Sequence, residues 1–535
     1  MSSVVPPRKK NSTPPRHVPG VPVSFRSRAL AWLHIPATAL CVVLAGCAAF
    51  LPVPPAPPAV VDPVSLFPVA DYSQDVDHWI DPLGPDYDTP FLNTLDQHAQ
   101  FEVLYSRYFG TGANSASPWN HAFIDTPAHG KSDGDIAGLL LRRIANYDNT
   151  GKPGRDIGYG QNFRPQTKSW IDAIAQNMNV RQFERMAPYT PGRRAIATGN
   201  LLVRELPTMD PFFYSHRLAG QGYPFDSLQI SAILPGTPLY VRGSSLDGGW
   251  CYVQAPEVHG WVRSDNLGFV DDMFVDTWKK TARQALGAVI TASAPVRDSH
   301  GAFRFDAPAG TVLPLRPGTT PGMREVLVPA RNVDGRAVIS TAQLSDTQIV
   351  PAPWSATPRH LATLLKALIG RPYGWGNMGL YNDCSSELKN IFAAFGIWLQ
   401  RHSFDQMAAG QITDLSIATP AERLDYLARN GQPMRTLVYI NGHVMLYLGN
   451  TTHGAQAVPV VYHGVWGLRP ADDSWRAIIG GTLIQPLLES IPEDLALQSL
   501  AAKPIFQISI LGAPAADTPV QSDDGSPADW ASGGV

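Results

Sequence analysis

The spacing of hydrophobic residues changes several times along this chain, and each change predicts a different kind of structure. Between about residues 70 and 195 the pattern is irregular and helical, with one helix predicted over 92–108 and another within 170–186. From about 196 to 272, short alternating segments separated by turn residues predict a small barrel of about five strands. Residues 280–350 repeat this pattern more weakly, which predicts a second small barrel.

The last globular unit starts near Trp354 and has helical spacing first and strand alternation afterwards. Helices are predicted over 355–369 and 386–395. Ser403 with Gln406, and Thr419 with Glu422, have the spacing of capping boxes. The pair Asn441-Gly442 lies between two alternating segments and predicts a hairpin with a tight turn. Helices followed by antiparallel strands predict an α+β unit.

These patterns predict a multidomain protein in which two all-β barrels and a mainly helical N-terminal domain precede the α+β unit. The predicted parts are a signal segment (1–47), a Pro-rich linker (48–68), the helical domain (69–195), the first barrel (196–275), the second barrel (276–350), the α+β domain (351–512) and a disordered tail (513–535).

The formal net charge of −3 gives no argument for nucleic-acid binding, and the basic residues that stand out lie within the first 28 positions. An apolar run follows from Ala29 to Phe50, as in a secretory signal. It contains Leu44-Ala-Gly-Cys47, which resembles the lipobox of bacterial lipoproteins. That resemblance implies cleavage before Cys47, its diacylation and a membrane anchor. Ala48 favours the outer membrane. The alternative is an uncleaved signal anchor, and either case predicts export.

The chain has four cysteines, of which Cys251 and Cys384 would remain as free thiols in a mature lipoprotein. Cys251 lies between Trp250 and Tyr252 in a predicted strand, which favours a buried small hydrophobic residue. Cys384 lies in the first turn of a predicted helix, where amide groups favour a thiolate. Its side chain is therefore the candidate nucleophile.

A cysteine nucleophile needs an imidazole from elsewhere in the chain. We expect His443, Met445 and Tyr447 to share one face of a strand packed on the Cys384 helix, so that His443 reaches the sulfur. His463, at the end of the next strand, could then fix the tautomer of His443.

Other interpretations of these residues stay open at this point. Cys384 can be an inert cysteine, and His360, His402 and His453 compete with His443 and His463. A zinc site made of Cys384, His443 and His463 is a further alternative, although these separations match no compact zinc pattern. We expect no metal and no other cofactor.

Several motifs resemble the NlpC/P60 family of bacterial cell-wall cysteine peptidases: Tyr373-Gly-Trp-Gly, Asp383-Cys-Ser-Ser, Leu399-Gln-Arg-His-Ser and Gly442-His-Val-Met-Leu-Tyr-Leu-Gly. The segments at 204–208, 224–229 and 249–253 resemble the bacterial SH3 domain fused to such enzymes. A second SH3-like domain and an N-terminal stabilising domain account for the remaining residues.

The resemblance implies hydrolysis of the γ-D-glutamyl to diamino-acid bond in peptidoglycan stem peptides. Cys384 would be the nucleophile, His443 the base and His463 the residue that orients it. The substrate-binding candidates are Asp383, Ser385, Tyr373, Trp375 and, in the first barrel, Asp226, for which a structural turn role is the alternative.

In related enzymes with SH3 domains, the first barrel narrows the cleft so that stems with a free L-Ala amine fit. A carboxylate such as Asp383 could meet that ammonium group. Asn377 stands where relatives often have Gly, and Gln400 and His402 also depart from the family pattern. The alternatives are a wall-binding protein without catalysis, and an amidase or acyltransferase on the same fold. We expect a monomer.

Overall fold

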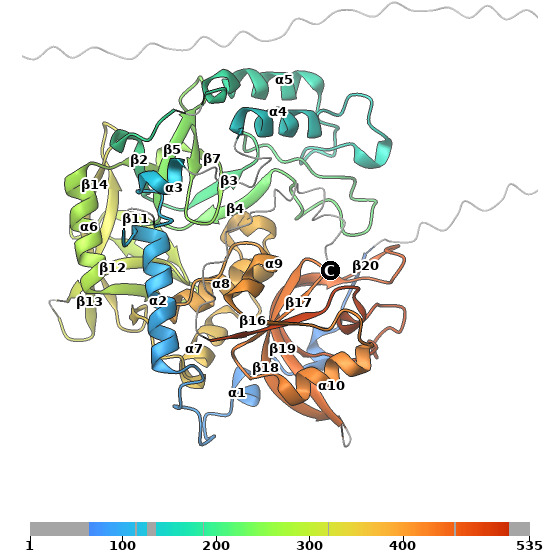
Figure 1. Ribbon diagram of the computed structural model, residues 1–535. Coiled ribbons are helices and arrows are strands. Elements are labelled where there is room, and N and C mark those ends of the chain that lie inside the picture. The colour runs from blue at the N-terminus through green and yellow to red at the C-terminus, as the bar shows by residue number, and fades with distance from the viewer. Residues whose placement is uncertain are drawn as a thin grey trace, which may run out of the picture. The chain divides into compact units, whose positions relative to one another are not determined.

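The computed structural model describes residues 64–112, 115–125, 135–185, 187–318, 320–453 and 456–512 (Figure 1). These residues belong to one unit, Asp62–Val535. The predicted signal segment with Cys47, most of the predicted linker and the tail from 513 lie outside the described residues. In the described part of the chain, no helix combines the length and apolarity that a membrane span requires.

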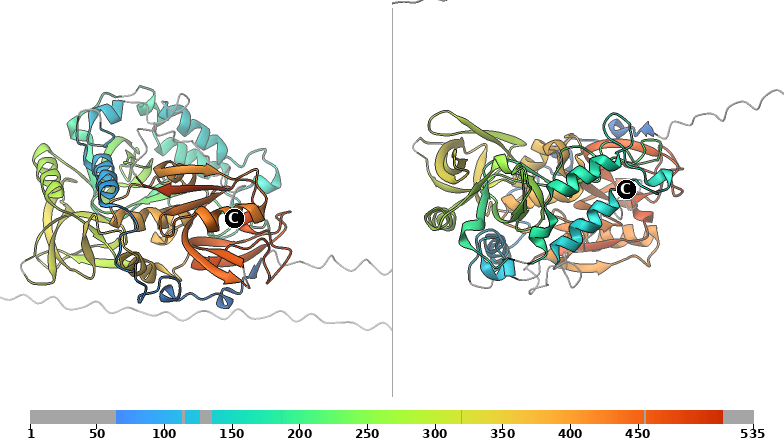
Figure 2. Two further views of the ribbon diagram at one scale, coloured as in Figure 1. Left: turned by 60° about the horizontal axis from the view of Figure 1, so that its bottom comes forward. Right: turned by 90° about the horizontal axis from the view of Figure 1, so that it is seen from above.

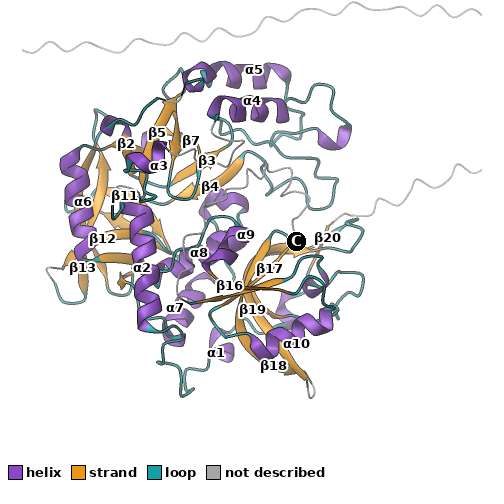
Figure 3. Ribbon diagram, viewed as in Figure 1, coloured by secondary structure: helices purple, strands orange, loops and turns teal. Residues whose placement is uncertain are grey.

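The N-terminal region is helical, as its spacing predicts (Figure 3). Its α-helices are α1 (Val76–Trp79), α2 (Thr94–Phe109), α3 (His121–Asp125), α4 (Ile136–Asn146) and α5 (Lys168–Asn177). Helix α2 begins after Asn93, whose side chain accepts a hydrogen bond from the Asp96 amide. The helix predicted within 170–186 is α5, which starts slightly earlier and ends at Asn177, before Asn179 with its positive φ of 49°. The apolar faces of α4 and α5 pack against aromatic residues of the first barrel.

The first barrel is a seven-stranded sheet with the order β4-β3-β7-β6-β5-β2-β8, two strands more than the sequence suggested. Its strands are β2 (Arg194–Ala197), β3 (Leu201–Arg204), β4 (Gln229–Ile233), β5 (Pro238–Ser244), β6 (Trp250–Gln254), β7 (His259–Arg263) and β8 (Leu267–Phe269). Cys251 is buried in the barrel core, where burial raises its thiol pKa to about 11. This residue is the buried small hydrophobic group that its neighbours predict.

A helix that the sequence did not predict, α6 (Asp272–Gln284), connects the two barrels. It begins at Asp271, whose side chain accepts a hydrogen bond from the Phe274 amide, and it crosses the predicted boundary at residue 275. The second barrel combines a five-stranded sheet, β14-β13-β12-β9-β15, with the hairpin β10-β11. Its strands are β9 (Leu286–Val289), β10 (Ser293–Arg297), β11 (Phe303–Pro308), β12 (Val312–Pro317), β13 (Met323–Arg331), β14 (Ala337–Ser345) and β15 (Ile349–Ala352).

The α+β unit has a seven-stranded sheet with the order β1-β20-β19-β18-β17-β21-β16 (Figures 1 and 2). Its later strands are β16 (Gly410–Asp414), β17 (Thr436–Ile440), β18 (His443–His453), β19 (Gln456–Leu468), β20 (Arg476–Pro486) and β21 (Gln507–Leu511). Strand β1 (Val64–Leu66) pairs in parallel with β20. This strand falls inside the predicted linker (48–68). The end of that linker therefore belongs to the sheet of the α+β unit.

The helices of this unit are α7 (Pro358–Leu368), α8 (Cys384–Ala394), α9 (Ser403–Gln406) and α10 (Pro420–Asn430). Helix α8 packs in one hydrophobic cluster with Leu437, Val444 and Leu446 of the sheet, and α10 packs in another with Met445 and Tyr447. Since neighbouring residues of a strand point to opposite faces, the sheet lies between these two helices.

One of the two predicted capping boxes is present and the other is wrong. Thr419 and Glu422 cap α10 reciprocally. At the second position, Ser403 donates its hydroxyl hydrogen to the Gly442 carbonyl, and Gln406 donates its side-chain amide to the Ser385 carbonyl. The polar side chains at the two ends of α9 therefore connect it to the turn before β18 and to the helix that begins with Cys384.

Candidate active site

Cys384 is the first residue of α8, in agreement with its predicted place at a helix start. Asp383 is the N-cap residue, and it forms a capping box with Ser386. The Ser386 amide donates to Asp383 Oδ1 at 3.0 Å, and the Asp383 amide donates to Ser386 Oγ at 2.9 Å. These two bonds fix the direction in which the chain enters the helix, and with it the position of the thiol.

The loop before Cys384 approaches the first barrel closely. Gly376 and Asn377 both have left-handed backbone angles, with φ of 56° and 63°. A Cβ atom on Gly376 would lie 2.6 Å from the Gln229 carbonyl oxygen, so this position requires glycine. Asn tolerates the left-handed region, and the Asn377 amide donates to Ser386 Oγ at 3.0 Å. Asn377 thus connects the loop to the start of α8.

His443 and His463 form a buried hydrogen-bonded pair, with 2.7 Å between His443 Nε2 and His463 Nδ1. As whole residues, His443 and His463 are 4% and 0% exposed. The hairpin turn that places His443 has positive φ at Asn441 and Gly442, as the predicted tight turn requires. The structure therefore brings together the two histidines that the sequence proposed as base and orienting residue.

The strand-face argument for His443 is wrong. Met445 and Tyr447, which share its alternation, pack with α10, whereas Val444 and Leu446 pack with α8. His443 is the first residue of β18, next to the turn, and the thiol of Cys384 lies by the backbone amide of the following residue, Val444. The part of β18 that lies by the thiol is thus the backbone at the start of the strand, directly after His443.

The thiol and the imidazoles are electrically neutral at pH 7 in this state. Burial, with a smaller effect of Asp383, raises the pKa of Cys384 to about 12, although the amides of Val444 and Ser385 favour the thiolate. Burial also lowers the pKa of His443 to about 3 and that of His463 well below its ordinary value. The helix start alone does not produce a thiolate here, because desolvation outweighs the amide groups.

Asp383 is paired with Arg401, a residue that the sequence did not identify as part of the site. Arg401 Nη2 lies 2.6 Å from Asp383 Oδ2, and both side chains are buried. Burial alone would raise the pKa of Asp383, but the Arg401 guanidinium and hydrogen bonds hold it below its ordinary value. Arg401 also donates to the hydroxyls of Ser385 and Ser231, at 2.8 and 2.7 Å. Asp383 and Ser385 are therefore held by an internal cation that also connects to the first barrel.

Tyr373 and Trp375 belong to an aromatic group beside the thiol. Burial raises the pKa of Tyr373 well above its ordinary value, and nearby Cys384 and Asp383 contribute. The Tyr373 ring lies 6.3 Å from that of Trp466, centroid to centroid. Phe225 of the first barrel lies 5.2 Å from Trp375 and 5.8 Å from Trp466. Phe225 and Trp466 were not identified from sequence, because their aromatic contacts exist only between folded domains.

Asp226 has the structural role that was the alternative to substrate binding. It is 1% exposed, and Arg204 Nη1 lies 2.5 Å from its Oδ2. Its Oδ1 accepts hydrogen bonds from the amides of Phe212 and Leu228. The carboxylate holds a turn of the barrel, and all its polar contacts are internal.

Of the competing histidines, His360 has other surroundings, whereas His402 is close enough to Arg401 and Asp383 for their charges to affect its pKa. His360 Nδ1 lies 2.7 Å from the Ser355 carbonyl, and its ring stacks on Trp354 at 3.8 Å. Burial lowers the pKa of His402 to about 4. The side chain of His453 lies outside the described residues. Within the described residues, no group of three or more His, Cys, Asp or Glu side chains is arranged to hold a metal ion.

Comparison with known proteins matches three parts of the chain to family models. They are the SH3 domain of SH3b1 type over residues 211–263, the SH3 domain of SH3b2 type over 271–319, and the NlpC/P60 family over 370–458. No curated protein matches this chain.

A solved NlpC/P60 endopeptidase from Photobacterium damselae subsp. piscicida is similar over 84% of this chain and 99% of its own, with 27% identity and a TM-score of 0.72. An NlpC/P60 family protein from Bacillus cereus ATCC 10987 matches over 57% of this chain and 98% of its own, at 14% identity, but its TM-score of 0.38 supports no argument. The chain therefore contains an NlpC/P60 domain, of a family of cysteine peptidases, and two bacterial SH3 domains ahead of it.

Proposed function

We propose that this protein is a peptidoglycan hydrolase that cleaves the γ-D-glutamyl to diamino-acid bond of stem peptides. Cys384 is the nucleophile, His443 the base and His463 the residue that orients the base. The observation that carries the proposal is the buried His443–His463 hydrogen bond of 2.7 Å beside the helix that begins with Cys384. Membership of the NlpC/P60 family supports the peptidase class.

The hydrogen bond between the histidines determines which nitrogen of His443 is free to accept the thiol proton. When His443 Nε2–H donates to His463 Nδ1, the Nδ1 atom of His443 is left as a proton acceptor. His443 takes the thiol proton as the Cys384 sulfur attacks the γ-carbonyl carbon. The C–N bond breaks, and the proton passes to the amine of the departing diamino acid. Water then hydrolyses the thioester and restores the thiol.

Both partners are neutral before the reaction, because burial raises the pKa of Cys384 and lowers that of His443. The proton therefore moves during the attack and not before it. A neutral imidazole is available as a base at every pH well above its pKa of about 3. Activity should therefore fall at low pH, as the His443 imidazole becomes protonated.

The family resemblance also implies a preference for stems with a free L-Ala amine. Asp383 was the candidate to meet that ammonium group, and Asp226 was the other carboxylate among the substrate-binding candidates; each forms a buried ion pair with an arginine. Neither carboxylate is left to select a positive charge. The preference therefore stays a prediction from the resemblance, and it is tested by comparing stems with free and blocked amines.

The test is digestion of a defined stem tripeptide, L-Ala-γ-D-Glu-diamino acid, with products identified by mass spectrometry. We expect the wild-type protein to release the diamino acid and L-Ala-D-Glu, and Cys384→Ala to release neither. Cys251→Ala is the matched control, because it removes the other described thiol, which lies in the first barrel.

Turnover by Cys384→Ala would refute the mechanism. Cleavage between muramic acid and L-Ala, assayed on a muramyl tripeptide, would indicate an amidase. Absence of any cleavage, with retained binding to cell walls, would favour the wall-binding alternative.

Export and a lipid anchor at Cys47 form a second part of the proposal. They rest on the sequence pattern that ends in Leu44-Ala-Gly-Cys47, which lies outside the described residues. We expect labelled fatty acid to enter the wild-type protein and not Cys47→Ala, and we expect the labelled protein in the outer-membrane fraction. Label that persists in Cys47→Ala would refute the anchor.

A further inference from the structure

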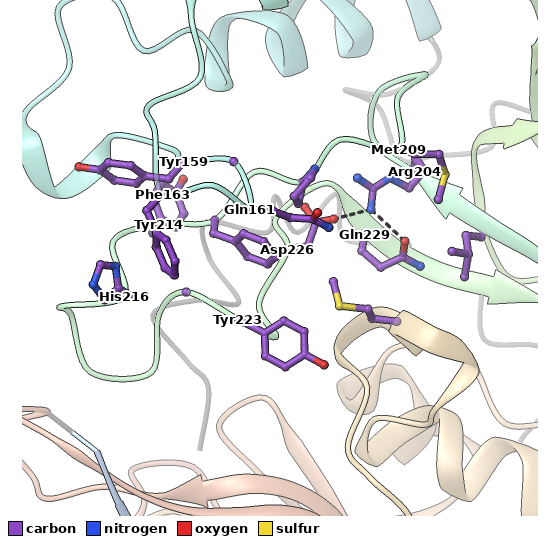
Figure 4. Close-up of a pocket in the computed structure, with 16 residues that line it drawn as sticks. Tyr159, Gln161, Phe163, Arg204, Met209, Tyr214, His216, Tyr223, Asp226 and Gln229 are labelled. Carbon is purple, nitrogen blue, oxygen red and sulfur yellow. Dashed lines mark hydrogen bonds and ion pairs between the residues drawn. The ribbon is translucent and has the colours of Figure 1, made fainter. Parts of the chain in front are cut away.

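A pocket of about 350 Å³ lies where three regions of the chain meet (Figure 4). One wall comes from Tyr159 and Phe163 of the helical region. The first barrel supplies most of the remaining residues, including His216 and Tyr223, and Met378 comes from the loop that leads to Cys384. A pocket of this size accommodates a small-molecule group, and its walls are formed without any other chain.

Two aromatic side chains in this pocket are exposed to solvent. Phe163 is 67% exposed and Tyr223 is 73% exposed. Phe163 has a positive φ of 59°, which is unfavourable for a bulky residue. Its ring lies 4.9 Å from that of His216, edge to face, and the Tyr223 ring lies 6.4 Å from that of Phe213. Two exposed rings beside a pocket, one of them on a strained backbone, are features of a binding surface.

The charged side chains that line the pocket, Arg204 and Asp226, carry no net charge together. Arg204 and Asp226 neutralise each other at its base, and Arg204 also donates to Gln229 Oε1 at 3.0 Å. The other polar groups include tyrosine hydroxyls, the Gln161 amide and the His216 imidazole. Aromatic faces with neutral hydrogen-bonding groups suit a sugar ring, which has apolar C–H faces and hydroxyl and acetamide edges.

The two ends of the substrate differ in charge, and this decides which end fits the pocket. The diamino acid carries carboxylates and an ammonium group, and these charges need charged partners. The other end of a glycan-linked stem is N-acetylmuramic acid, whose lactyl group forms a neutral amide with L-Ala. The neutral pocket therefore suits the sugar end.

Aromatic contacts connect the pocket with the thiol. Tyr223 lines the pocket, and Phe225, two residues later, packs against Trp375 and Trp466. Trp466 in turn contacts Tyr373, which lies beside Cys384. In a glycan-linked stem, L-Ala and D-Glu separate the sugar from the bond that is cut. A substrate that reaches from the pocket to the thiol would place these two residues along this aromatic run.

We propose that this pocket is a saccharide subsite, which holds the muramyl sugar of a glycan-linked stem peptide while its γ-D-glutamyl bond lies at Cys384. The proposal rests on the proposed function and narrows its substrate to muropeptides. The subsite is an alternative to the free-amine preference that the family resemblance implies. It agrees with the two internal ion pairs, since a substrate with a blocked L-Ala amine needs no free carboxylate.

The kinetic test uses three substrates with the same tripeptide: a free amine, an N-acetyl group and an N-acetylmuramyl group. We expect kcat/KM to be about tenfold higher for the muramyl substrate than for the acetyl one. Phe163→Ala and Tyr223→Ala should each bring this ratio closer to one, mainly through KM. Phe303→Ala is the matched control, since this Phe is 50% exposed on the second barrel, and it should leave the ratio unaltered. Equal kcat/KM for the muramyl and acetyl substrates, or a preference for the free amine, would overturn the subsite.

A binding measurement separates the subsite from the proposed reaction. Calorimetric titration of the full-length Cys384→Ala protein with N-acetylmuramyl-L-Ala-D-isoglutamine should show binding that Phe163→Ala weakens about tenfold. Binding without turnover of any substrate by the wild-type protein would refute the proposed function and leave the subsite standing. Cleavage of the tripeptide without such binding would refute the subsite and leave the proposed function standing.

Discussion

The buried ion pair between Asp383 and Arg401 allows a sharp test of how the nucleophile is positioned. Arg401→Met keeps an unbranched apolar side chain in place of the aliphatic part of arginine and removes the charge, so the Asp383 carboxylate is left in a buried site without its cation. Asp383→Asn removes the opposite charge, and Asn is as good an N-cap residue as Asp, so α8 keeps its start. The double variant removes the pair and leaves no uncompensated charge.

The size of the effect follows from the burial of the pair, whose side chains are 2% and 7% exposed. Removing one partner of such a pair costs about 3–5 kcal/mol, a large part of the roughly 5–15 kcal/mol that stabilises a typical domain. The double variant should lose less than the sum of the two single changes, by about 2 kcal/mol or more. Because Arg401 favours the thiolate and Asp383 opposes it, Arg401→Met should also raise the pKa of Cys384 and slow its alkylation.

Unfolding in urea gives the three free energies, and the rate of alkylation by iodoacetamide as a function of pH follows the thiol. Arg204→Met is the matched control, because it breaks the ion pair with Asp226 in the first barrel, where both side chains are also almost fully buried. It should destabilise the protein by a similar amount without slowing the alkylation of Cys384. Strictly additive losses in the cycle, or equal alkylation rates for Arg401→Met and the wild type, would refute this reasoning.

Three further predictions concern the surroundings of the site. Burial lowers the pKa of His443 from 6.5 to about 3, so the free energy of unfolding in urea should decrease as the pH falls through this range. The decrease should reach up to about 1.4 kcal/mol per pH unit, and His443→Gln should make it smaller. Gly376→Ala, which combines a φ of 56° with a 2.6 Å contact to a barrel carbonyl, should lower Tm by several degrees, and an unchanged Tm would mean that the loop can move away. Glu387→Leu leaves the Tyr462 hydroxyl and the Asn382 amide without their acceptor, which should lower the free energy of unfolding by about 1–3 kcal/mol for each group. Glu387→Gln should lower it less, and equal losses for the two variants in urea unfolding would contradict this.

The parts of the site that local patterns encode were predicted from the sequence. Cys384 at a helix start follows from helical spacing, and the hairpin that positions His443 follows from Asn441-Gly442. His463 was placed near His443 because consecutive antiparallel strands lie next to each other. Each of these relations spans few residues and depends on backbone geometry alone.

The relations that were missed depend on contacts between distant segments. Arg401 pairs with Asp383 and reaches Ser231 of the first barrel, and no spacing rule indicates such a three-way contact. Strand β1 (Val64–Leu66) is too short for a periodic pattern, and it is stabilised by pairing with β20, more than 400 residues later. The sequence also predicted a lowered pKa for the Cys384 thiol, whereas burial raises it. Desolvation depends on the packing around the sulfur, which the sequence does not reveal.

The most direct test of the central claim is the mass of the intact protein during turnover. After rapid acid quenching of a reaction with a stem tripeptide, we expect a fraction of the protein to carry one added L-Ala-γ-D-glutamyl group, and peptide mapping should locate it on Cys384. Cys251→Ala should show the same adduct and Cys384→Ala none. An adduct on another residue, or turnover of the tripeptide by Cys384→Ala, would contradict the account.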